Sequence, residues 1–292
     1  MNNDNNNILS RPESKLPRWM KVPMPVGEKY ARVKNLVNTH GLNTICTSGN
    51  CPNKGECWSA GTASFMILGD KCTRNCRFCA VKTQIPDPVD WNEPEKLALT
   101  IQTLKLKHCV ITSVDRDDLD DGGASFWVTT INEVKNYNPE ITMEVLIPDF
   151  WGKASLIQQI IDAKPNVISH NMETVRRLTP KIRSNANYNR SLSVINQVNN
   201  SGIISKSGIM LGLGETFDEV VETMDDLRRS GCKVLTIGQY LQPNAHLAKV
   251  EAYITPEIFE KYKTIGFEKG FSFVESSPLV RSSYHAERHA RL

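Results

Sequence analysis

Short apolar runs alternate with helix-like stretches over most of the chain from about residue 62. Six runs have the length and composition of buried strands, namely 63-68, 108-113, 141-147, 166-169, 205-211 and 233-237. Helical spacing of apolar positions is expected near 94-107, 123-137, 153-163, 189-200, 217-230 and 256-269. This alternation is typical of repeated βα units and predicts a parallel sheet covered by helices.

The segment 217-230 gives the clearest helix. Thr216 and Glu219 have the spacing of a capping box, the apolar residues that follow share one face, and Gly231 is expected to end the helix. Upstream of the βα units, residues 31-45 predict a short amphipathic helix closed by Gly41. Residues 1-30 are rich in Asn, Pro and Lys, and we expect a flexible leader that drapes over the body.

Composition and charge exclude several classes of protein. The formal charge is +3, from 35 basic and 32 acidic side chains, so bulk charge gives no reason to expect nucleic-acid binding. No run approaches the ~18 consecutive apolar residues that a membrane span requires, and the first residues lack a signal pattern. We therefore expect a cytoplasmic protein whose eight cysteines are metal ligands or buried thiols rather than disulfides.

Six of the eight cysteines lie between Cys46 and Cys79, whereas Cys109 and Cys232 stand apart in apolar surroundings. The separate pair is expected to be packed thiols. The clustered six form two triplets, and each triplet has its own spacing.

Cys72, Cys76 and Cys79 follow the first strand at spacings x3 and x2. In parallel α/β folds, ligands gather at the carboxyl ends of the strands. Three thiolates on one loop suit a 4Fe–4S cluster and leave one of its four irons open to another ligand. The alternative is a zinc loop built on Cys76 and Cys79 with two further ligands elsewhere.

Cys46, Cys51 and Cys57 form the second triplet, at spacings x4 and x5. The Pro, Gly and Asn residues between them favour a folded-back loop that brings the three sulfurs together. A second cluster on these thiols needs a fourth ligand. No further cysteine is near enough, so that ligand is another type of residue or the substrate.

The CX3CX2C loop after the first strand resembles that of the radical S-adenosylmethionine (SAM) superfamily. The paired spacings, CX4CX5C ahead of CX3CX2C, resemble the lipoyl synthase family over nearly the whole chain, with further matches at 114-124, 238-243 and 281-284 (RSSY). The resemblance implies a partial (βα)6 TIM-like barrel with terminal extensions. The expected divisions are 1-30 (leader), 31-61 (auxiliary-cluster extension), 62-275 (radical SAM barrel) and 276-292 (C-terminal RSSY segment).

The resemblance also implies a cofactor site. The open iron of the Cys72, Cys76 and Cys79 cluster would bind SAM and supply a radical that abstracts hydrogen from unreactive carbon. The candidate SAM contacts are Phe78, Glu144, Asn171, Glu173 and Gly212. For Glu144, an inward position and an outward salt bridge are both open, and for Gly212 the alternative is a tight turn.

In this family a serine of the RSSY segment completes the auxiliary cluster held by Cys46, Cys51 and Cys57. Ser283 is favoured here, with Ser282 as the alternative. An Fe–O bond is lost more easily than an Fe–thiolate bond, which suits a cluster that opens during the reaction.

The implied activity is that of a sulfurtransferase. Two sulfur atoms are inserted at carbons 6 and 8 of an octanoyl-lysine, two SAM are consumed, and the auxiliary 4Fe–4S cluster donates the sulfur. The implied partners are octanoylated lipoyl carrier domains, such as 2-oxoacid dehydrogenase acyltransferase subunits and the glycine cleavage H-protein. A flavodoxin or ferredoxin as electron donor and a carrier that rebuilds the cluster are implied too, with no nucleic acid and no membrane.

Two other classes compete with this interpretation. One is a different radical enzyme, such as a biotin-synthase-like sulfur inserter or a peptide-modifying enzyme, and the CX4CX5C and RSSY segments argue against both. The other is a zinc-binding adaptor with structural cysteines. The basic side chains of Arg176, Arg177, Lys181 and Arg183 are interpreted as a solvated face, with docking of an acidic carrier as the alternative. Residues 115-121 are expected to form a loop at the barrel rim rather than a calcium site.

Overall fold

The computed structural model describes residues 9-10, 16-22, 27-59, 62-183 and 185-290. Within these residues an eight-stranded sheet has the order β12-β10-β9-β8-β7-β6-β3-β2. Its strands are β2 (Asn43–Thr44), β3 (Ser64–Ile67), β6 (His108–Ser113), β7 (Thr142–Leu146), β8 (Val167–Ser169), β9 (Ile204–Leu211), β10 (Val234–Gln239) and β12 (Phe273–Ser276). Apart from β2, which pairs antiparallel with β3, neighbouring strands are parallel.

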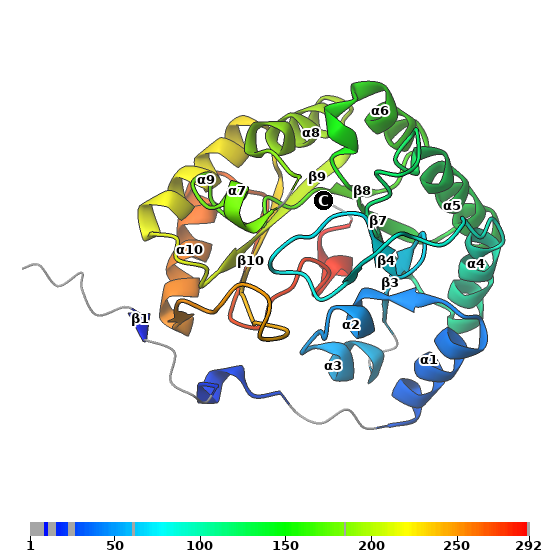
Figure 1. Ribbon diagram of the computed structural model, residues 1–292, viewed down its shortest axis with the longest axis horizontal. Coiled ribbons are helices and arrows are strands. Elements are labelled where there is room, and N and C mark those ends of the chain that lie inside the picture. Colours follow the sequence, from blue (N-terminus) through cyan, green and yellow to red (C-terminus); the bar gives the residue numbers. More distant parts are fainter. Residues whose placement is uncertain (1–8, 11–15, 23–26, 60–61, 184, 291–292) are drawn as a thin grey trace, which may run out of the picture.

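The six predicted strands correspond to β3, β6, β7, β8, β9 and β10, which stand side by side in chain order. The sheet curls but does not close, because its edges are β12 and β2 (Figure 1). This open array confirms the expected partial barrel. The strand β12 was not predicted; it adds a seventh parallel strand beyond β10.

Helices form an outer ring around the curled sheet (Figure 1). The ring consists of α4 (Glu93–Leu104), α5 (Ala124–Tyr137), α6 (Ala154–Asp162), α8 (Tyr188–Asn200), α9 (Phe217–Arg229) and α10 (Pro256–Glu268). These six match the predicted helices. The capping box of α9 is present, with the Glu219 amide donating to Thr216 Oγ1 and the Thr216 amide donating to Glu219 Oε2 at 2.8 Å.

The N-terminal extension packs beside the β3 edge. Its helix α1 spans Glu28–Thr39, so it begins three residues and ends six residues earlier than predicted. It ends there because the chain turns at Gly41 and then enters β2. Two short helices follow, α2 (Ile45–Ser48) and α3 (Lys54–Ser59). Part of the predicted leader, residues 1-8, 11-15 and 23-26, lies outside the described residues, while β1 (Leu9–Ser10) pairs antiparallel with β11 (Tyr253–Ile254).

Several short elements complete the fold. They are β4 (Lys71–Cys72), β5 (Lys82–Thr83), α7 (Thr179–Ile182), and the 3-10 turns η1 (Arg18–Met20), η2 (Phe150–Gly152) and η3 (Ala286–Arg288). Apolar side chains from the sheet and the ring of helices form the core, which buries Cys109 and Cys232 as predicted. No helix in the described ranges is both long enough and apolar enough to cross a membrane.

Candidate active site

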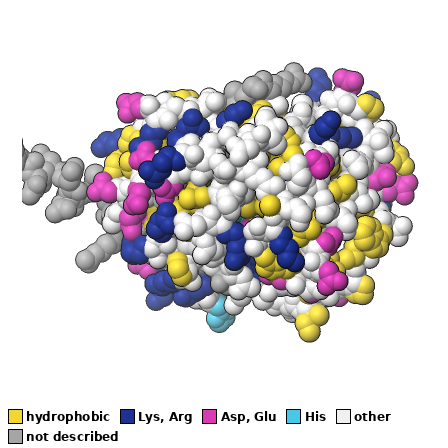
Figure 2. All heavy atoms as spheres, turned by 90° about the horizontal axis from the view of Figure 1, so that it is seen from above, with side chains coloured by type: hydrophobic (Ala, Val, Ile, Leu, Met, Phe, Trp, Pro, Cys, Tyr) yellow, Lys and Arg dark blue, Asp and Glu magenta, His cyan; other side chains and the backbone are white. Residues whose placement is uncertain are grey.

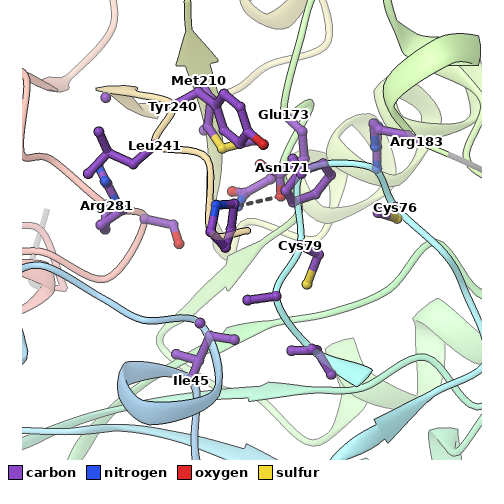
Figure 3. Close-up of a pocket in the computed structure, with 18 of the residues that line it drawn as sticks. Ile45, Cys76, Cys79, Asn171, Glu173, Arg183, Met210, Tyr240, Leu241 and Arg281 are labelled. Carbon is purple, nitrogen blue, oxygen red and sulfur yellow. Dashed lines mark hydrogen bonds between the residues drawn. The ribbon is translucent and has the colours of Figure 1, made fainter. Parts of the chain in front are cut away.

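A cavity of about 1010 Å³ opens at the carboxyl ends of the strands. Its wall combines three distant parts of the chain: the CX3CX2C loop, the loop between Cys46 and Cys57, and the C-terminal segment through Arg281 and Ser282. Figure 3 shows Cys76 and Cys79 across this space from Arg281, with Ile45 of α2 on a third side. Both cysteine-rich loops therefore face one chamber.

The CX3CX2C loop holds its three thiols close together. Cys72 Sγ accepts hydrogen bonds from the backbone amides of Arg74 at 3.4 Å and Asp115 at 3.3 Å. Burial raises the pKa of Cys72 to about 11 and that of Cys79 to about 12, and the charge of Cys76 adds to both. Thiols with raised pKa values stay protonated near neutral pH. They lose their protons readily when a metal binds the sulfur atoms in place of the protons.

Cys46, Cys51 and Cys57 gather in the same way on α2, the following turn and α3. The Cys51 amide donates to the Cys46 carbonyl at 3.1 Å, which closes the predicted fold-back. Burial raises the pKa of Cys57 to about 12, and the neighbouring Cys46 and Cys51 contribute to that rise. The described side chains include no group of three that converges on a single metal ion. A 4Fe–4S cluster does not require one, since each thiolate binds a different iron.

The RSSY segment lies against this second triplet. Asn53 Nδ2, from the loop, donates to the Leu279 carbonyl at 2.7 Å, and Tyr284 Oη donates to Glu56 Oε1 at 3.1 Å. Burial lowers the pKa of Arg281, and the neighbouring Cys51 opposes that shift. The tertiary fold thus brings residues 281-284 to cysteines more than 220 positions away in the sequence.

Polar groups that suit a charged ligand line the opposite wall. Asn171 Nδ2 donates to Glu173 Oε1 at 3.1 Å, whereas Asn171 Oδ1 is buried and has no partner among the described residues. Glu173 is held at φ +64° by backbone bonds to Gly208 and Met210, and burial raises the pKa of its carboxyl while Arg183 opposes this. An unpartnered acceptor beside a buried carboxyl fits a ligand that brings hydrogen-bond donors and positive charge.

Comparisons with known proteins agree with this geometry. The Radical SAM superfamily model matches residues 66-227. A lipoyl synthase of Treponema denticola is 60% identical over 94% of each chain. One from Phocaeicola vulgatus is also 60% identical, covering 95% of this chain and 98% of its own, and one from Christiangramia forsetii is 54% identical over 99% of each chain. The chain belongs to the lipoyl synthase family. It is therefore a radical SAM enzyme, whose cofactors are SAM and 4Fe–4S clusters.

More distant solved structures share the fold of this lipoyl synthase family member. Methylornithine synthase (PylB) superposes with a TM-score of 0.56 at 10% identity, covering 86% of this chain and 79% of that one. The [FeFe]-hydrogenase maturase HydG gives 0.57 at 11% identity, covering 90% and 74%. At such low identity these likenesses show the barrel architecture alone.

Only some of the remaining candidate residues of the SAM site line the cavity. Phe78, Asn171 and Glu173 line the cavity. Gly212 is outside its lining, because a Cβ there would lie 2.2 Å from Gln239 Nε2, so a close approach and φ +99° account for this glycine. Glu144 does face the barrel interior, but it accepts both hydrogen bonds from Lys206 Nζ, lies 3.4 Å from His289 Nε2 and is absent from the cavity wall. We therefore leave Gly212 and Glu144 out of the proposed cofactor contacts.

A buried arginine that the sequence did not single out holds the CX3CX2C loop. Arg74 donates to both carboxylate oxygens of Asp117 at 2.7 and 2.8 Å and to Asp149 Oδ1 at 2.9 Å, and its Nη1 lies 3.3 Å from Asp115. Thr73 Oγ1 adds a bond to the Asp115 carbonyl at 2.9 Å. Residues 115-121 thus form the expected rim loop, and they clamp the cluster-binding loop.

Of the four basic residues after β8, Arg176, Arg177 and Lys181 are exposed, as the expected solvated face requires, whereas Arg183 is buried. Arg183 is 6% exposed and donates to the Met172 carbonyl and to Ser191 Oγ, so that part of the interpretation is wrong. Arg176 pairs with Asp226 and Arg177 with Glu219, both with half-exposed guanidinium groups. Figure 2 shows the same mixture of neighbouring basic and acidic side chains over one face of the molecule.

Proposed function

We propose that this chain inserts two sulfur atoms at carbons 6 and 8 of an octanoyl-lysine on a lipoyl carrier domain, with an auxiliary cluster as sulfur donor. The observation that carries the proposal is the shared chamber: the wall of one cavity includes the CX3CX2C cysteines, residues of the loop between Cys46 and Cys51, and the RSSY segment. A carbon atom activated in that chamber has the second cluster loop within the same enclosed space.

In the proposed site, Cys72, Cys76 and Cys79 hold the radical SAM cluster. Asn171 and Glu173 are suited to bind the amino group and ribose of SAM, because one offers an unpartnered acceptor within the described part of the chain and the other a buried carboxyl. Phe78 lies at the cavity wall, where its backbone can meet the adenine. When bound, the cluster and SAM supply a carbon radical that takes a hydrogen atom from an unactivated methylene group.

Cys46, Cys51 and Cys57 are the proposed thiolate ligands of the auxiliary cluster, with a serine of the RSSY segment as the fourth ligand. Ser283 is our first choice and Ser282, which lines the cavity, is the alternative. The bonds from Asn53 to Leu279 and from Tyr284 to Glu56 support this assignment, since they bracket both serines at the second cysteine loop.

Part of the cavity wall is apolar and suits the acyl group. Ile45, Leu146 and Met210 line the cavity from three different elements. Such side chains exclude water and hold an extended acyl chain through burial of its methylene groups, each contributing about 0.8 kcal/mol. General-base catalysis cannot activate these carbons, because they carry no acidic proton.

The proposed macromolecular substrate is an octanoylated carrier domain, either an acyltransferase subunit of a 2-oxoacid dehydrogenase or a glycine cleavage H-protein. A flavodoxin or ferredoxin is the proposed reductant, and a cluster carrier would rebuild the auxiliary cluster after turnover. We place the enzyme in the cytoplasm, because none of the eight cysteines, all within the described ranges, forms a disulfide, and two thiolate-bound clusters require a reducing compartment.

The proposal is tested by counting iron and acid-labile sulfide after anaerobic reconstitution. We expect roughly eight irons per chain in the wild type and roughly four in the Cys46→Ala, Cys51→Ala, Cys57→Ala variant. A Cys109→Ala, Cys232→Ala variant is the matched control and should keep about eight, since both thiols lie in the core. Wild-type protein that holds four irons or fewer, or that holds zinc, would overturn the sulfur-donor assignment.

A further inference from the structure

The C-terminal segment, residues 277-290, runs into the middle of the barrel. Figure 1 shows it inside the ring formed by the strands and helices. The 3-10 turn η3 (Ala286–Arg288) leads to His289, whose side chain is completely buried. The ring of His289 packs against Phe273 of β12, with ring centroids 5.1 Å apart.

His289 meets a buried ion pair there. Lys206 Nζ donates to both carboxylate oxygens of Glu144 at 2.8 Å and contacts His289 Nε2 at 3.0 Å. Since an ammonium group has three donors and no acceptor, Nε2 is the acceptor of the Lys206 bond. Nε2 also lies 3.4 Å from Glu144 Oε2, and Nδ1 has no partner among the described residues. The three side chains each have 0% exposure, so the lysine uses all its donors inside the protein.

Neither SAM binding nor the auxiliary loop accounts for this triad. Glu144 on β7 and Lys206 on β9 are absent from the cavity wall, as is His289. A buried ion pair adds little stability compared with apolar residues of the same volume, because desolvation offsets the attraction. What the ion pair adds is a hydrogen bond with a fixed direction. Lys206 has one proton left after its two bonds to Glu144, and His289 is the acceptor for that proton.

The other end of the same segment is fixed at the cavity. The Gln239 amide donates to the Pro278 carbonyl at 3.1 Å, and Asn53 donates to the Leu279 carbonyl. Ser282 and Ser283 lie between this anchor and His289. A short segment pinned at both ends has few conformations left, so the serines are held in one register against the cysteine loop.

We propose that the Lys206–Glu144–His289 triad is a positioning site, which anchors the C-terminal segment in the barrel and thereby holds the serine ligand at the auxiliary cluster. The inference rests on the proposed function, because it gives the triad a role toward that cluster. His289 is a positioning residue in this scheme and touches neither cluster nor substrate.

The test uses full-length protein carrying Cys72→Ala, Cys76→Ala and Cys79→Ala, so that only the auxiliary cluster is reconstituted. Iron release to a ferrous chelator is then measured for this parent and for His289→Ala and His289→Gln. We expect His289→Ala to release iron at least about tenfold faster, the range found when a group supporting a metal ligand is removed. His289→Gln should restore most of the parent behaviour, because its amide oxygen can accept the Lys206 proton.

A double-mutant cycle separates positioning from general loosening. Ser283→Ala and Ser282→Ala are compared first, and the one that speeds iron release identifies the ligand. If His289 acts through that serine, adding His289→Ala to the serine variant produces little further acceleration. Full additivity would overturn the inference, as would identical iron release in His289→Ala and the parent.

Two further measurements distinguish positioning of the segment from a general loss of stability. Hydrogen exchange of the cluster-free wild type and of His289→Ala should show faster exchange in residues 277-290 of the variant, and equal exchange would overturn the inference. Ile160→Ala, a core change in α6, is the control for general destabilisation and should leave iron release unchanged. A parent that binds no iron at all would instead refute the proposed function, so the two failures are distinguishable.

Discussion

Asn53 and Leu279, 226 positions apart in the sequence, are joined by a hydrogen bond of 2.7 Å from the asparagine amide to the leucine carbonyl. Asn53 is 2% exposed and lies between two of the auxiliary cysteines. The bond therefore joins the N-terminal cysteine loop directly to the segment that carries the RSSY serines. The bond forms between protein groups alone, so we expect it in the cluster-free protein as well.

Replacing Asn53 should weaken the contact between the cysteine loop and the C-terminal segment in the cluster-free protein. In Asn53→Leu the Leu279 carbonyl loses its buried donor, and we expect a loss of about 1–3 kcal/mol in the free energy of unfolding. Urea unfolding measures it. Tyr284→Phe is the comparison, since it removes an exposed bond to Glu56 and should cost well under half as much. Equal costs for the two variants would contradict the role given to Asn53.

Arg74 should be the most sensitive residue of the CX3CX2C loop outside the cysteines. Arg74→Met leaves Asp115, Asp117 and Asp149 without their shared cation, and removing one member of a buried ion pair costs roughly 3–5 kcal/mol. The expected result is a lower urea midpoint and loss of the iron bound by Cys72, Cys76 and Cys79. Arg190→Met is the control, since Arg190 contacts one of these carboxylates and is 30% exposed. It should retain that iron.

The sequence predicted the barrel because periodicity is a local property. Each of the six strands contains a short apolar run, whereas β12 escaped notice because it is four residues long and alternates in burial. The cysteine triplets were found for a similar reason: their ligands are neighbours in the chain. The position of Glu144 could not be decided in this way, since its partner Lys206 is 62 positions away.

The charged residues show more clearly that contacts between distant parts of the chain cannot be predicted from local sequence. Arg183 looks like one of four cations in a row, and its burial becomes apparent once α7 and α8 are folded around it. Arg74 stands between two cluster cysteines, which was a usable signal. Its three carboxylate partners, however, follow two strands: Asp115 and Asp117 come after β6 and Asp149 comes after β7, and the barrel brings these two strand ends to one place.

Gly208 should be required for SAM binding. A Cβ at this position would lie 2.8 Å from Thr236 Oγ1 and 2.9 Å from Asn171 Oδ1, so an alanine displaces the proposed contact. We expect Gly208→Ala to weaken SAM about tenfold or more, or about 1.4 kcal/mol, while the iron content stays normal. Equilibrium binding to reconstituted enzyme measures this. Gly202→Ala is the control: its methyl group would meet no atom within 4 Å, and although the φ of +83° costs some stability, it should bind SAM normally.

Glu93 should make the stability of the fold depend on pH. Burial raises the pKa of its carboxyl to about 7, despite the hydrogen bond from the Leu68 amide, from an ordinary value of 4.5. The folded state therefore keeps a proton that the unfolded state releases between about pH 4.5 and 7, and stability falls as pH rises through that window. Above pH 7 this loss in the free energy of unfolding is complete and amounts to roughly 3 kcal/mol.

Glu93→Gln removes this dependence. Its free energy of unfolding should exceed that of the wild type at pH 8 and converge with it near pH 4, as measured by urea unfolding at a series of pH values. The matched control is Glu95→Gln, which removes the same charge from an exposed position of the same helix. If the free energies of unfolding of the wild type and Glu93→Gln differ by the same amount at every pH, the role given to Glu93 is refuted.

The buried pair of Glu144 and Lys206 allows stability and positioning to be separated. Burial raises the pKa of Glu144, but the opposing effects, of which the charge of Lys206 is the largest, outweigh burial and bring the pKa down to about 2, so the carboxylate is charged at neutral pH. Lys206→Met alone leaves that charge unpaired in the barrel and should cost about 3–5 kcal/mol. The double variant Glu144→Leu, Lys206→Met removes both charges and should unfold at nearly the wild-type urea concentration.

The double variant nevertheless has no donor for His289. If the triad serves stability alone, a protein with a normal urea midpoint should hold its auxiliary cluster normally. If the triad positions the C-terminal segment, the same protein should release auxiliary iron as fast as His289→Ala does, although its unfolding is unchanged. The two explanations therefore predict different rates of iron release for a variant whose urea unfolding is normal. The reason is that apolar side chains can fill the barrel but cannot donate a hydrogen bond to the His289 imidazole.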